Sequence, residues 1–218
     1  MSAAKENSAK GALEFIEDGM VVGLGSGTTT AYFIDLLGKK MREERISVVG
    51  VVTSFDSEIL AKKAGIPVMP LEGKVDLAVD GADIVRKDYV LKGGGGALTR
   101  EKIVDYAADK FIVIADEAKA EPSLSYPIVV EVVPFSYQYV MKEMEKLGLT
   151  PELRVGGKKL GPVVTDNSNF ILDCVGGIKG EPKEFEKTLN SIPGVVENGV
   201  FSKFWKIIIG NEKGHYEF

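Results

Sequence analysis

The sequence predicts an α/β protein in which an open, mainly parallel β-sheet domain is joined to a smaller α+β domain. Three observations lead to this prediction. Up to residue 116, short apolar runs rich in β-branched residues alternate with segments of helical spacing. After about residue 126, the order changes to strand, helix, two strands, helix and strand. The composition, 44% hydrophobic and 27% charged over 218 residues, is that of a globular protein with a substantial core.

The first domain is expected to begin with a strand, a loop and a helix. The run MVVGLG at 20–25 is apolar and closed by glycine, which predicts a buried strand, and Phe33, Leu37 and Met41 then recur at helical spacing. Further strands are predicted at 46–54, 75–83 and 110–116, with a helix at 55–65. Such alternation predicts an open Rossmann-like sheet with helices on both faces, which binds ligands beyond the carboxyl ends of its strands.

The second domain is expected to be a ferredoxin-like α+β unit. Strands are predicted at 127–134, 150–155, 169–175 and 194–201, and helices at 135–148 and 181–192. This β-α-β-β-α-β order is the one such units have. The strand-like run at 203–211 is expected to return to the first domain. We therefore predict an α/β catalytic domain at 1–126 plus 205–218, and a ferredoxin-like lid or oligomerisation domain at 127–204.

Composition limits the possible functions. The formal net charge is -5 and no basic block is present, which argues against a nucleic-acid partner. Cys174 and His215 are the only residues of their kinds. Their counts exclude an internal disulfide and a His/Cys zinc site, and make a histidine-based relay improbable. No apolar run approaches the roughly 18 residues of a membrane span, so we expect a cytoplasmic protein with no membrane contact.

The loop GLGSGTTT at 23–30 lies where the first predicted strand passes into the first predicted helix. Amides at such a helix N-terminus favour an anion, so the loop is a candidate phosphate site with serine and threonine hydroxyls. It matches neither G-x-G-x-x-G nor a P-loop, because the position five after Gly23 is Thr28 and no lysine follows. The plainer alternative is a helix cap, where Ser and Thr are also favoured.

Two acids, Asp80 and Asp83, stand three residues apart in DGAD, at the end of the third predicted strand. An Asp-Gly turn alone explains many such pairs. The strand before them is apolar enough to be buried. We therefore expect both acids to emerge at the sheet edge where parallel sheets bind ligands.

Four glycines at 93–96 follow Lys92 and precede a predicted helix. Each glycine costs roughly 0.5 to 1 kcal/mol relative to alanine in ordered backbone, so the run indicates a need for bare backbone. Its amides can form an anion-binding nest. Glu101 lies near the N-terminus of the following helix, where the ionised carboxylate that a proton-abstracting base needs is favoured. The alternative for Glu101 is a solvated first-turn acid.

Together, GLGSGTTT, DGAD and KGGGGALTREK closely resemble, in order and separation, the ribose-5-phosphate isomerase A family. The IAD motif before Lys119, VEVVPF, GPVVTDNSNFILD and SIPGVVENGVF are similar to further landmarks of that family, so the resemblance covers nearly the whole chain. It implies interconversion of D-ribose 5-phosphate and D-ribulose 5-phosphate in the non-oxidative pentose phosphate pathway. It also implies a homodimer or homotetramer that uses neither a metal nor another cofactor.

The resemblance assigns roles to individual residues. Glu101 matches the family's proton acceptor, and Lys119 and Lys5 match substrate contacts, Lys5 in a less distinctive context. The implied catalytic residues are Glu101, Asp80, Asp83 and Lys92. The implied substrate-binding residues are Ser26, Gly27, Thr28, Thr29, Asp80, Gly81, Ala82, Asp83, Lys92, Gly93, Gly94, Gly95, Lys119 and Lys5. One departure is Ile84, which stands where the family commonly has glutamate, before a loop one residue shorter.

An aldose and its ketose differ in the position of hydrogen on C1 and C2. A base must therefore remove a carbon-bound proton and return it to the neighbouring carbon through an enediolate. Glu101 is expected to be this base, while Lys92 and the glycine amides stabilise the charge on oxygen. Asp80 and Asp83 would orient the sugar hydroxyls, pass protons between O1 and O2, or help open the ring. Their division of roles is left open.

Two other functions are possible on the same fold. A non-catalytic sugar-phosphate sensor would need the phosphate loop but no base, and normally carries a DNA-binding segment, which the sequence lacks. A dinucleotide-dependent dehydrogenase would need the glycine fingerprint and an acid closing the second strand. That strand ends instead at Thr53 and Ser54.

Overall fold

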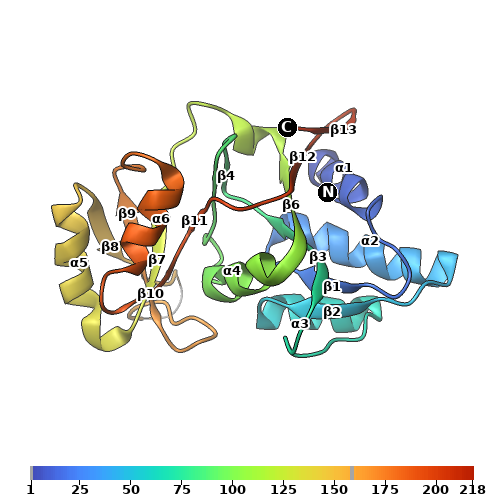
Figure 1. The fold of residues 1–218 in the computed structure, drawn as a ribbon, viewed down its shortest axis with the longest axis horizontal. Helices are drawn as coiled ribbons and strands as arrows, with labels where there is room; N and C mark the ends of the chain where they lie inside the picture. The colour runs from blue at the N-terminus through green and yellow to red at the C-terminus, as the bar shows by residue number, and fades with distance from the viewer. Residues whose placement is uncertain (1, 158–159) are drawn as a thin grey trace. The chain divides into compact units, whose positions relative to one another are not determined.

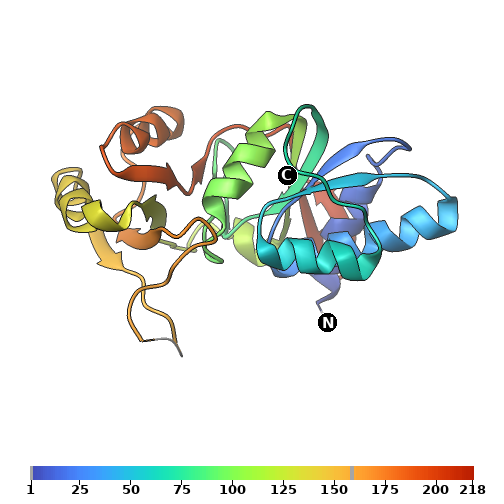
Figure 2. The same ribbon diagram turned by 90° about the horizontal axis from the view of Figure 1, so that it is seen from below.

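The computed structural model describes residues 2–157 and 160–218 and forms two compact units. Unit 1 comprises Met1–Ala82, Arg100–Pro122 and Lys203–Phe218, and unit 2 comprises Asp83–Thr99 and Ser123–Ser202. The ribbon of both units is drawn in Figure 1 and, turned by 90°, in Figure 2. Among the described residues, no helix is both long and apolar enough to cross a membrane.

Unit 1 is built on a six-stranded sheet with the order β13-β12-β6-β3-β1-β2. Every neighbouring pair is parallel except β12 and β13, so the predicted mainly parallel sheet is confirmed. The strands are β1 (Val21–Leu24), β2 (Val49–Val52), β3 (Val75–Gly81), β6 (Ala108–Asp116), β12 (Lys206–Asn211) and β13 (Gly214–Glu217). The carboxyl ends of β1, β2 and β3 therefore share one edge, where the loops of interest begin.

Helices cover both faces of this sheet (Figure 1). On one face, alternate strand residues such as Leu24 and Val79 form a single core with Phe33 and Leu37 of the second helix. On the other face, Val104 of the fourth helix approaches the backbone of Gly23 so closely that a Cβ there would lie 2.7 Å from it. The helices are α1 (Ala3–Leu13), α2 (Thr28–Glu44), α3 (Phe55–Ala64) and α4 (Leu98–Ala107), and a 3-10 turn, η1 (Glu117–Ala120), follows β6.

Unit 2 contains a four-stranded antiparallel sheet with the order β10-β7-β9-β8. Its strands are β7 (Ile128–Val132), β8 (Thr150–Leu153), β9 (Phe170–Val175) and β10 (Val195–Asn198), and its helices are α5 (Tyr137–Lys146) and α6 (Pro182–Asn190), with a 3-10 turn η2 (Pro134–Ser136). Met144 and Leu189 bring both helices into one core with Val130 and its alternate neighbours, so α5 and α6 cover the same face (Figure 2). The ferredoxin-like prediction is confirmed.

A small three-stranded sheet, β11-β5-β4, also belongs to unit 2. It pairs β5 (Val90–Leu91) with β4 (Ile84–Val85) and with β11 (Val200–Phe201). The segment 83–99 thus falls in unit 2, whereas the sequence placed all of 1–126 in the first domain. Strands of only two residues show no hydrophobic periodicity in the sequence. Their assignment to unit 2 follows from the pairing of β5 with β11, more than 100 residues later in the chain. The lid or oligomerisation role stays a prediction.

Candidate active site

The carboxylate of Asp80 organises the loop that follows β1. Asp80 is fully buried near the end of β3. Its Oδ1 accepts the backbone N–H of Ser26 at 3.2 Å and that of Gly81 at 2.6 Å. The hydroxyl of Thr30 donates to the same oxygen at 3.4 Å. A Cβ on Gly25 would lie 2.1 Å from the Asp80 Cγ, so this close approach requires glycine.

The N-terminus of α2 presents donors to solvent. Its N-cap is Gly27, with φ +108°, and no side chain caps the helix. Thr28, the first helical residue, is exposed, and its Oγ1 accepts from the Lys5 Nζ at 2.8 Å. The helix-cap alternative is therefore excluded. An ammonium group, hydroxyls and an uncapped helix N-terminus lie together, which is the arrangement that favours a phosphate.

A hydroxyl cluster ties this loop to the end of β2. The Ser26 Oγ lies 2.8 Å from the Thr53 Oγ1 and donates to the Ser54 Oγ at 2.6 Å. Ser54 also caps α3 by accepting the N–H of Ser57 at 3.0 Å. Hydroxyl groups thus occupy the end of β2, where a dinucleotide-binding protein carries an acidic residue. The side chain of Ser26 therefore holds the loop in position.

Glu101 lies in the first turn of α4 and is only 5% exposed. A solvated first-turn acid would be far more exposed, so that alternative is excluded. The first turn of a helix favours a negative charge by typically 0.3 to 1 kcal/mol. Glu101 is therefore a buried carboxyl group in the first turn of a helix.

The glycine run forms a tight turn in unit 2. The Gly96 N–H donates to the Gly93 carbonyl at 3.0 Å, and Gly93 has φ +113°. The Gly94 N–H donates to the Asp83 Oδ2 at 2.8 Å. A Cβ on Gly94 would lie 2.5 Å from the Tyr126 hydroxyl. Bare backbone is thus required, and the anion that the Gly94 amide holds in this structure is the Asp83 carboxylate.

Lys92 leads into this turn and is 3% exposed. Its backbone N–H donates to the Gly199 carbonyl at 2.9 Å, and its Nζ lies 5.5 Å from the centre of the Phe201 ring. Ile84, which departs from the family pattern, is buried in the core of unit 2 and pairs with Leu91. The shorter loop is therefore a packed hairpin.

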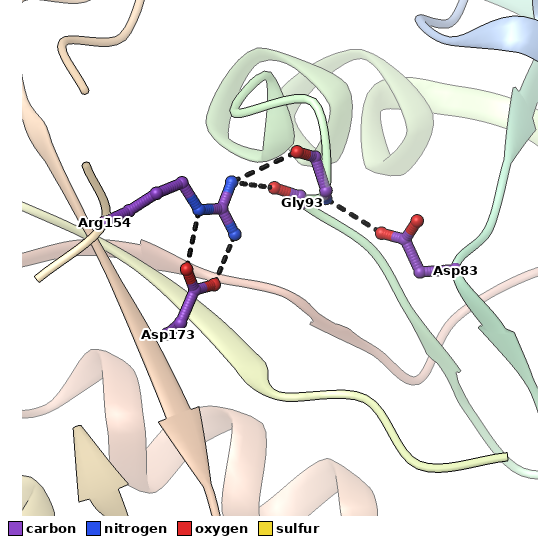
Figure 3. A network of polar contacts seen from close by, with 5 residues as sticks. Asp83, Gly93, Arg154 and Asp173 are labelled. Atoms are coloured by element: carbon purple, nitrogen blue, oxygen red, sulfur yellow. Dashed lines mark hydrogen bonds and ion pairs between the residues drawn. The ribbon is translucent and has the colours of Figure 1, made fainter. Parts of the chain in front are cut away.

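Arg154 contacts the glycine turn from the side opposite Asp83 (Figure 3). Its Nη1 donates to the carbonyl of Gly93 at 2.8 Å and to that of Gly94 at 3.2 Å. Its Nε donates to Asp173 on β9 at 2.7 Å, and its Nη2 donates to the other oxygen of the same carboxylate. Burial alone would lower the pKa of Arg154, but the hydrogen bonds and charge of Asp173 outweigh it and raise that pKa above its ordinary value.

Tyr126 lies beside the same turn. Burial, with the charge of Asp83 added, raises the pKa of Tyr126 to about 12. Its hydroxyl is therefore protonated at neutral pH and can donate a hydrogen bond.

A second polar cluster surrounds Glu131, which is fully buried on β7. Its Oε2 accepts from the Thr99 hydroxyl at 2.6 Å. Its Oε1 accepts from the Thr165 hydroxyl at 2.9 Å and from the side-chain amides of Asn167 at 3.1 Å and Asn169 at 2.8 Å. Thr99 stands two residues before Glu101 in the first turn of α4, so the cluster anchors the start of that helix.

Arg154, Asp173 and Glu131 belong to none of the sequence motifs that predict the site. Arg154 follows β8 and lies 61 residues from Gly93 along the chain. Nothing in TPELRV distinguishes it from an exposed arginine at a strand end. Glu131 did carry a signal, because an acid inside the apolar run VVEVV must be satisfied internally if the run is buried.

The family model of ribose 5-phosphate isomerase A (phosphoriboisomerase A) matches residues 49–214. The chain belongs to this family. A curated ribose-5-phosphate isomerase A from Methanococcus aeolicus is 51% identical over 210 residues, covering 94% of this chain and 89% of that protein. The solved ribose 5-phosphate isomerase A of Methanocaldococcus jannaschii has a TM-score of 0.94 at 45% identity, covering 98% of this chain and 97% of its own.

A solved D-ribose-5-phosphate isomerase in complex with phospho-erythronic acid is similar to the same degree, with a TM-score of 0.94 and 44% identity. It covers 98% of this chain and 96% of that one.

In this member of the ribose-5-phosphate isomerase A family, the expected site residues form two groups. In unit 1, Asp80 contacts Ser26 and Gly81, and Lys5 contacts Thr28. In unit 2, Asp83 contacts Gly94. Lys119 lies half-buried on η1. Among the residues that the structure describes, no group of three or more His, Cys, Asp or Glu side chains could hold a metal ion.

Proposed function

We propose that this protein is a ribose-5-phosphate isomerase, which interconverts D-ribose 5-phosphate and D-ribulose 5-phosphate through an enediolate, as in the non-oxidative pentose phosphate pathway. The observation that carries the proposal is the family membership over nearly the whole chain, joined to a buried carboxyl group at the expected base, Glu101. The relative solved with phospho-erythronic acid, a phosphorylated sugar acid, supports a sugar phosphate as the substrate.

The phosphate group is proposed to bind at the N-terminus of α2. The Lys5 ammonium group and the hydroxyls of Thr28 and Thr29 supply charge and donors, and the uncapped helix N-terminus adds its amides. These contacts lie far from the reacting carbons, so they hold the ground state and the transition state about equally. They therefore contribute to substrate affinity more than to turnover.

Thr28→Val is expected to raise KM for ribose 5-phosphate about tenfold while kcat changes less than about threefold, because only uniform binding is lost. Steady-state kinetics of the purified variant measure both constants. Thr188→Val is the matched control, since the Thr188 hydroxyl is exposed on α6 and donates to the Glu184 carbonyl of its own helix. A fall in kcat with KM unchanged would contradict the phosphate assignment.

Glu101 is proposed to remove the proton from C2 of the open-chain aldose and to return it to C1. The C–H electron pair moves into the C1–C2 double bond of the enediolate, and charge collects on the oxygen of the former carbonyl. Lys92 can stabilise that charge with its ammonium group. One carboxylate serves both directions of the transfer, so no second base is required.

The structure favours different roles for Asp80 and Asp83. Asp80 is fully buried and already accepts from two loop amides and from Thr30, which suits a group that shapes the phosphate loop. Asp83 is half-buried and accepts from the Gly94 amide. We therefore assign to Asp83 the exchange of protons with the sugar hydroxyls, and to Asp80 the positioning of the loop.

The reaction itself is tested with ribose 5-phosphate in D2O. The wild-type protein should form ribulose 5-phosphate, introduce deuterium at the exchanging carbon, and do so equally well after dialysis against EDTA. NMR of the product reports both the conversion and the label. A ligand-induced thermal shift without product would indicate the non-catalytic sensor instead, and loss of activity with EDTA would contradict the metal-free mechanism.

We also propose that the protein needs no cofactor, acts in the cytoplasm without nucleic-acid or membrane partners, and forms a homodimer or homotetramer. Large apolar side chains of unit 2, including Phe135 at 99% and Leu160 at 96% exposure, support self-association. The ferredoxin-like unit would then serve as the oligomerisation domain.

A further inference from the structure

The peptide group between Gly93 and Gly94 is held from both of its sides (Figure 3). Its carbonyl, on Gly93, accepts from the Arg154 Nη1 at 2.8 Å. Its N–H, on Gly94, donates to the Asp83 Oδ2 at 2.8 Å. In a planar trans peptide the C=O and N–H point in opposite directions. A guanidinium group that fixes the carbonyl therefore also fixes the direction of the N–H.

We propose that Arg154 is a positioning residue for catalysis, which sets the orientation of the Asp83 carboxylate through the Gly93–Gly94 peptide. The hydrogen bonds described link Arg154 to Asp83 through this peptide, and the charges of the two side chains also attract each other directly. The inference rests on the proposed isomerase function for its kinetic consequence, but its structural part concerns only residues of unit 2.

The contacts of Arg154 require an arginine. Asp173 receives two parallel hydrogen bonds from Nε and Nη2, which locks the guanidinium plane, while Nη1 remains directed at both glycine carbonyls. Lysine has one ammonium group and lacks this fixed fork, so it cannot hold the carboxylate and the two carbonyls in the same way. The pair is partly shielded, with side-chain exposures of 16% for Arg154 and 25% for Asp173, which keeps solvent from competing freely.

The glycine turn depends on this external support. Gly93 has φ +113°, which glycine adopts readily and other residues rarely adopt. A segment of four glycines can also adopt many other backbone conformations. The Gly93 carbonyl accepts from both the Gly96 N–H and Arg154, so without the guanidinium the peptide keeps the turn bond at its carbonyl and the Asp83 bond at its N–H, and loses the charged donor. Loss of Arg154 would therefore allow the peptide to rotate and release Asp83.

The test compares Arg154→Met, Arg154→Lys and Asp173→Asn with the wild-type protein. Arg154→Met is expected to lower kcat roughly 10- to 100-fold, because a small misplacement of a catalytic group costs up to about that much, while KM changes less than about threefold. Asp173→Asn should give a smaller loss, and Arg154→Lys should recover part of the loss seen with methionine. Arg42→Met is the matched control, because the exposed Arg42 likewise donates to a backbone carbonyl, that of Ala64, and should leave kcat unchanged.

A second measurement does not depend on activity. In ¹H–¹⁵N spectra of the wild-type protein, the Gly94 amide proton should lie downfield and exchange slowly, as a donor to a carboxylate does. Arg154→Met should move it upfield and speed its exchange, whereas Arg42→Met should not.

The inference is overturned if Arg154→Met loses thermal stability but keeps both its kcat and its Gly94 amide signal, since Arg154 would then be only structural. It is also overturned if methionine and lysine at position 154 are equally impaired in kcat, with no change at Gly94. If the wild-type protein fails to isomerise ribose 5-phosphate, the proposed function fails, but the Gly94 comparison still decides whether Arg154 orients the peptide.

Discussion

Glu101→Gln is expected to reduce kcat for ribose 5-phosphate by roughly 10² to 10⁴-fold, the range that a positioned general base contributes. Glutamine keeps the size of the side chain and one carbonyl oxygen, but its amide cannot accept a proton from carbon. Binding of the phosphate group does not depend on this change, so KM should move little. The kcat measured in a coupled steady-state assay and the rate of deuterium incorporation from D2O should fall together.

Glu58→Gln provides the matched control for this experiment. Glu58 also lies in the first turn of a helix, α3, and its Oε1 accepts from Lys62 at 2.5 Å on the surface. Its neutralisation should leave kcat unchanged. Wild-type turnover in Glu101→Gln would remove the base from the mechanism. A loss of turnover with deuterium exchange intact would place Glu101 after the proton-abstraction step.

The parallel sheet could be predicted because strands buried on both faces read as continuous apolar runs. The helix α1 could not, because the residues it buries are small or polar: Ser8, Ala9, Gly11 and Ala12. These positions carry no hydrophobic periodicity, and the helix packs by close approach of its backbone. A Cβ on Gly210 of β12, for example, would lie 1.9 Å from the Ala4 carbonyl oxygen.

The candidate site was predictable to the extent that its residues are neighbours in sequence. The phosphate loop, Asp80 and the glycine run are local motifs whose composition alone indicates their chemistry. Arg154 and Asp173 become neighbours only because β8 and β9 pair in register. Their link to the glycine turn depends on tertiary packing within unit 2, which no short motif encodes. Glu101 lies between these two cases. Its place in the first turn of a helix could be predicted from the sequence, but its burial could not.

The largest effect on stability is expected from Glu131→Ala. This substitution removes the acceptor of four buried or partly buried donors, from Thr99, Thr165, Asn167 and Asn169. A buried donor left without an acceptor costs about 1 to 3 kcal/mol, so a loss of about 3 kcal/mol is expected even after water or neighbouring groups satisfy some of them. At 2 to 4 °C for each kcal/mol, Tm should fall by roughly 6 to 12 °C.

Two variants separate this polar cluster from a general effect of removing a glutamate from the sheet. Glu152 is exposed on β8, which belongs to the same sheet and lies beyond β9 from β7, so Glu152→Ala should change the unfolding free energy by less than about 0.5 kcal/mol. Glu131→Gln should be milder than Glu131→Ala, because its amide oxygen can still accept from one side and the Thr99 hydroxyl can rotate to accept from its NH2 group. Urea unfolding measures all three free energies, and an alanine variant as stable as the glutamine variant would show that the four hydrogen bonds do not stabilise unit 2.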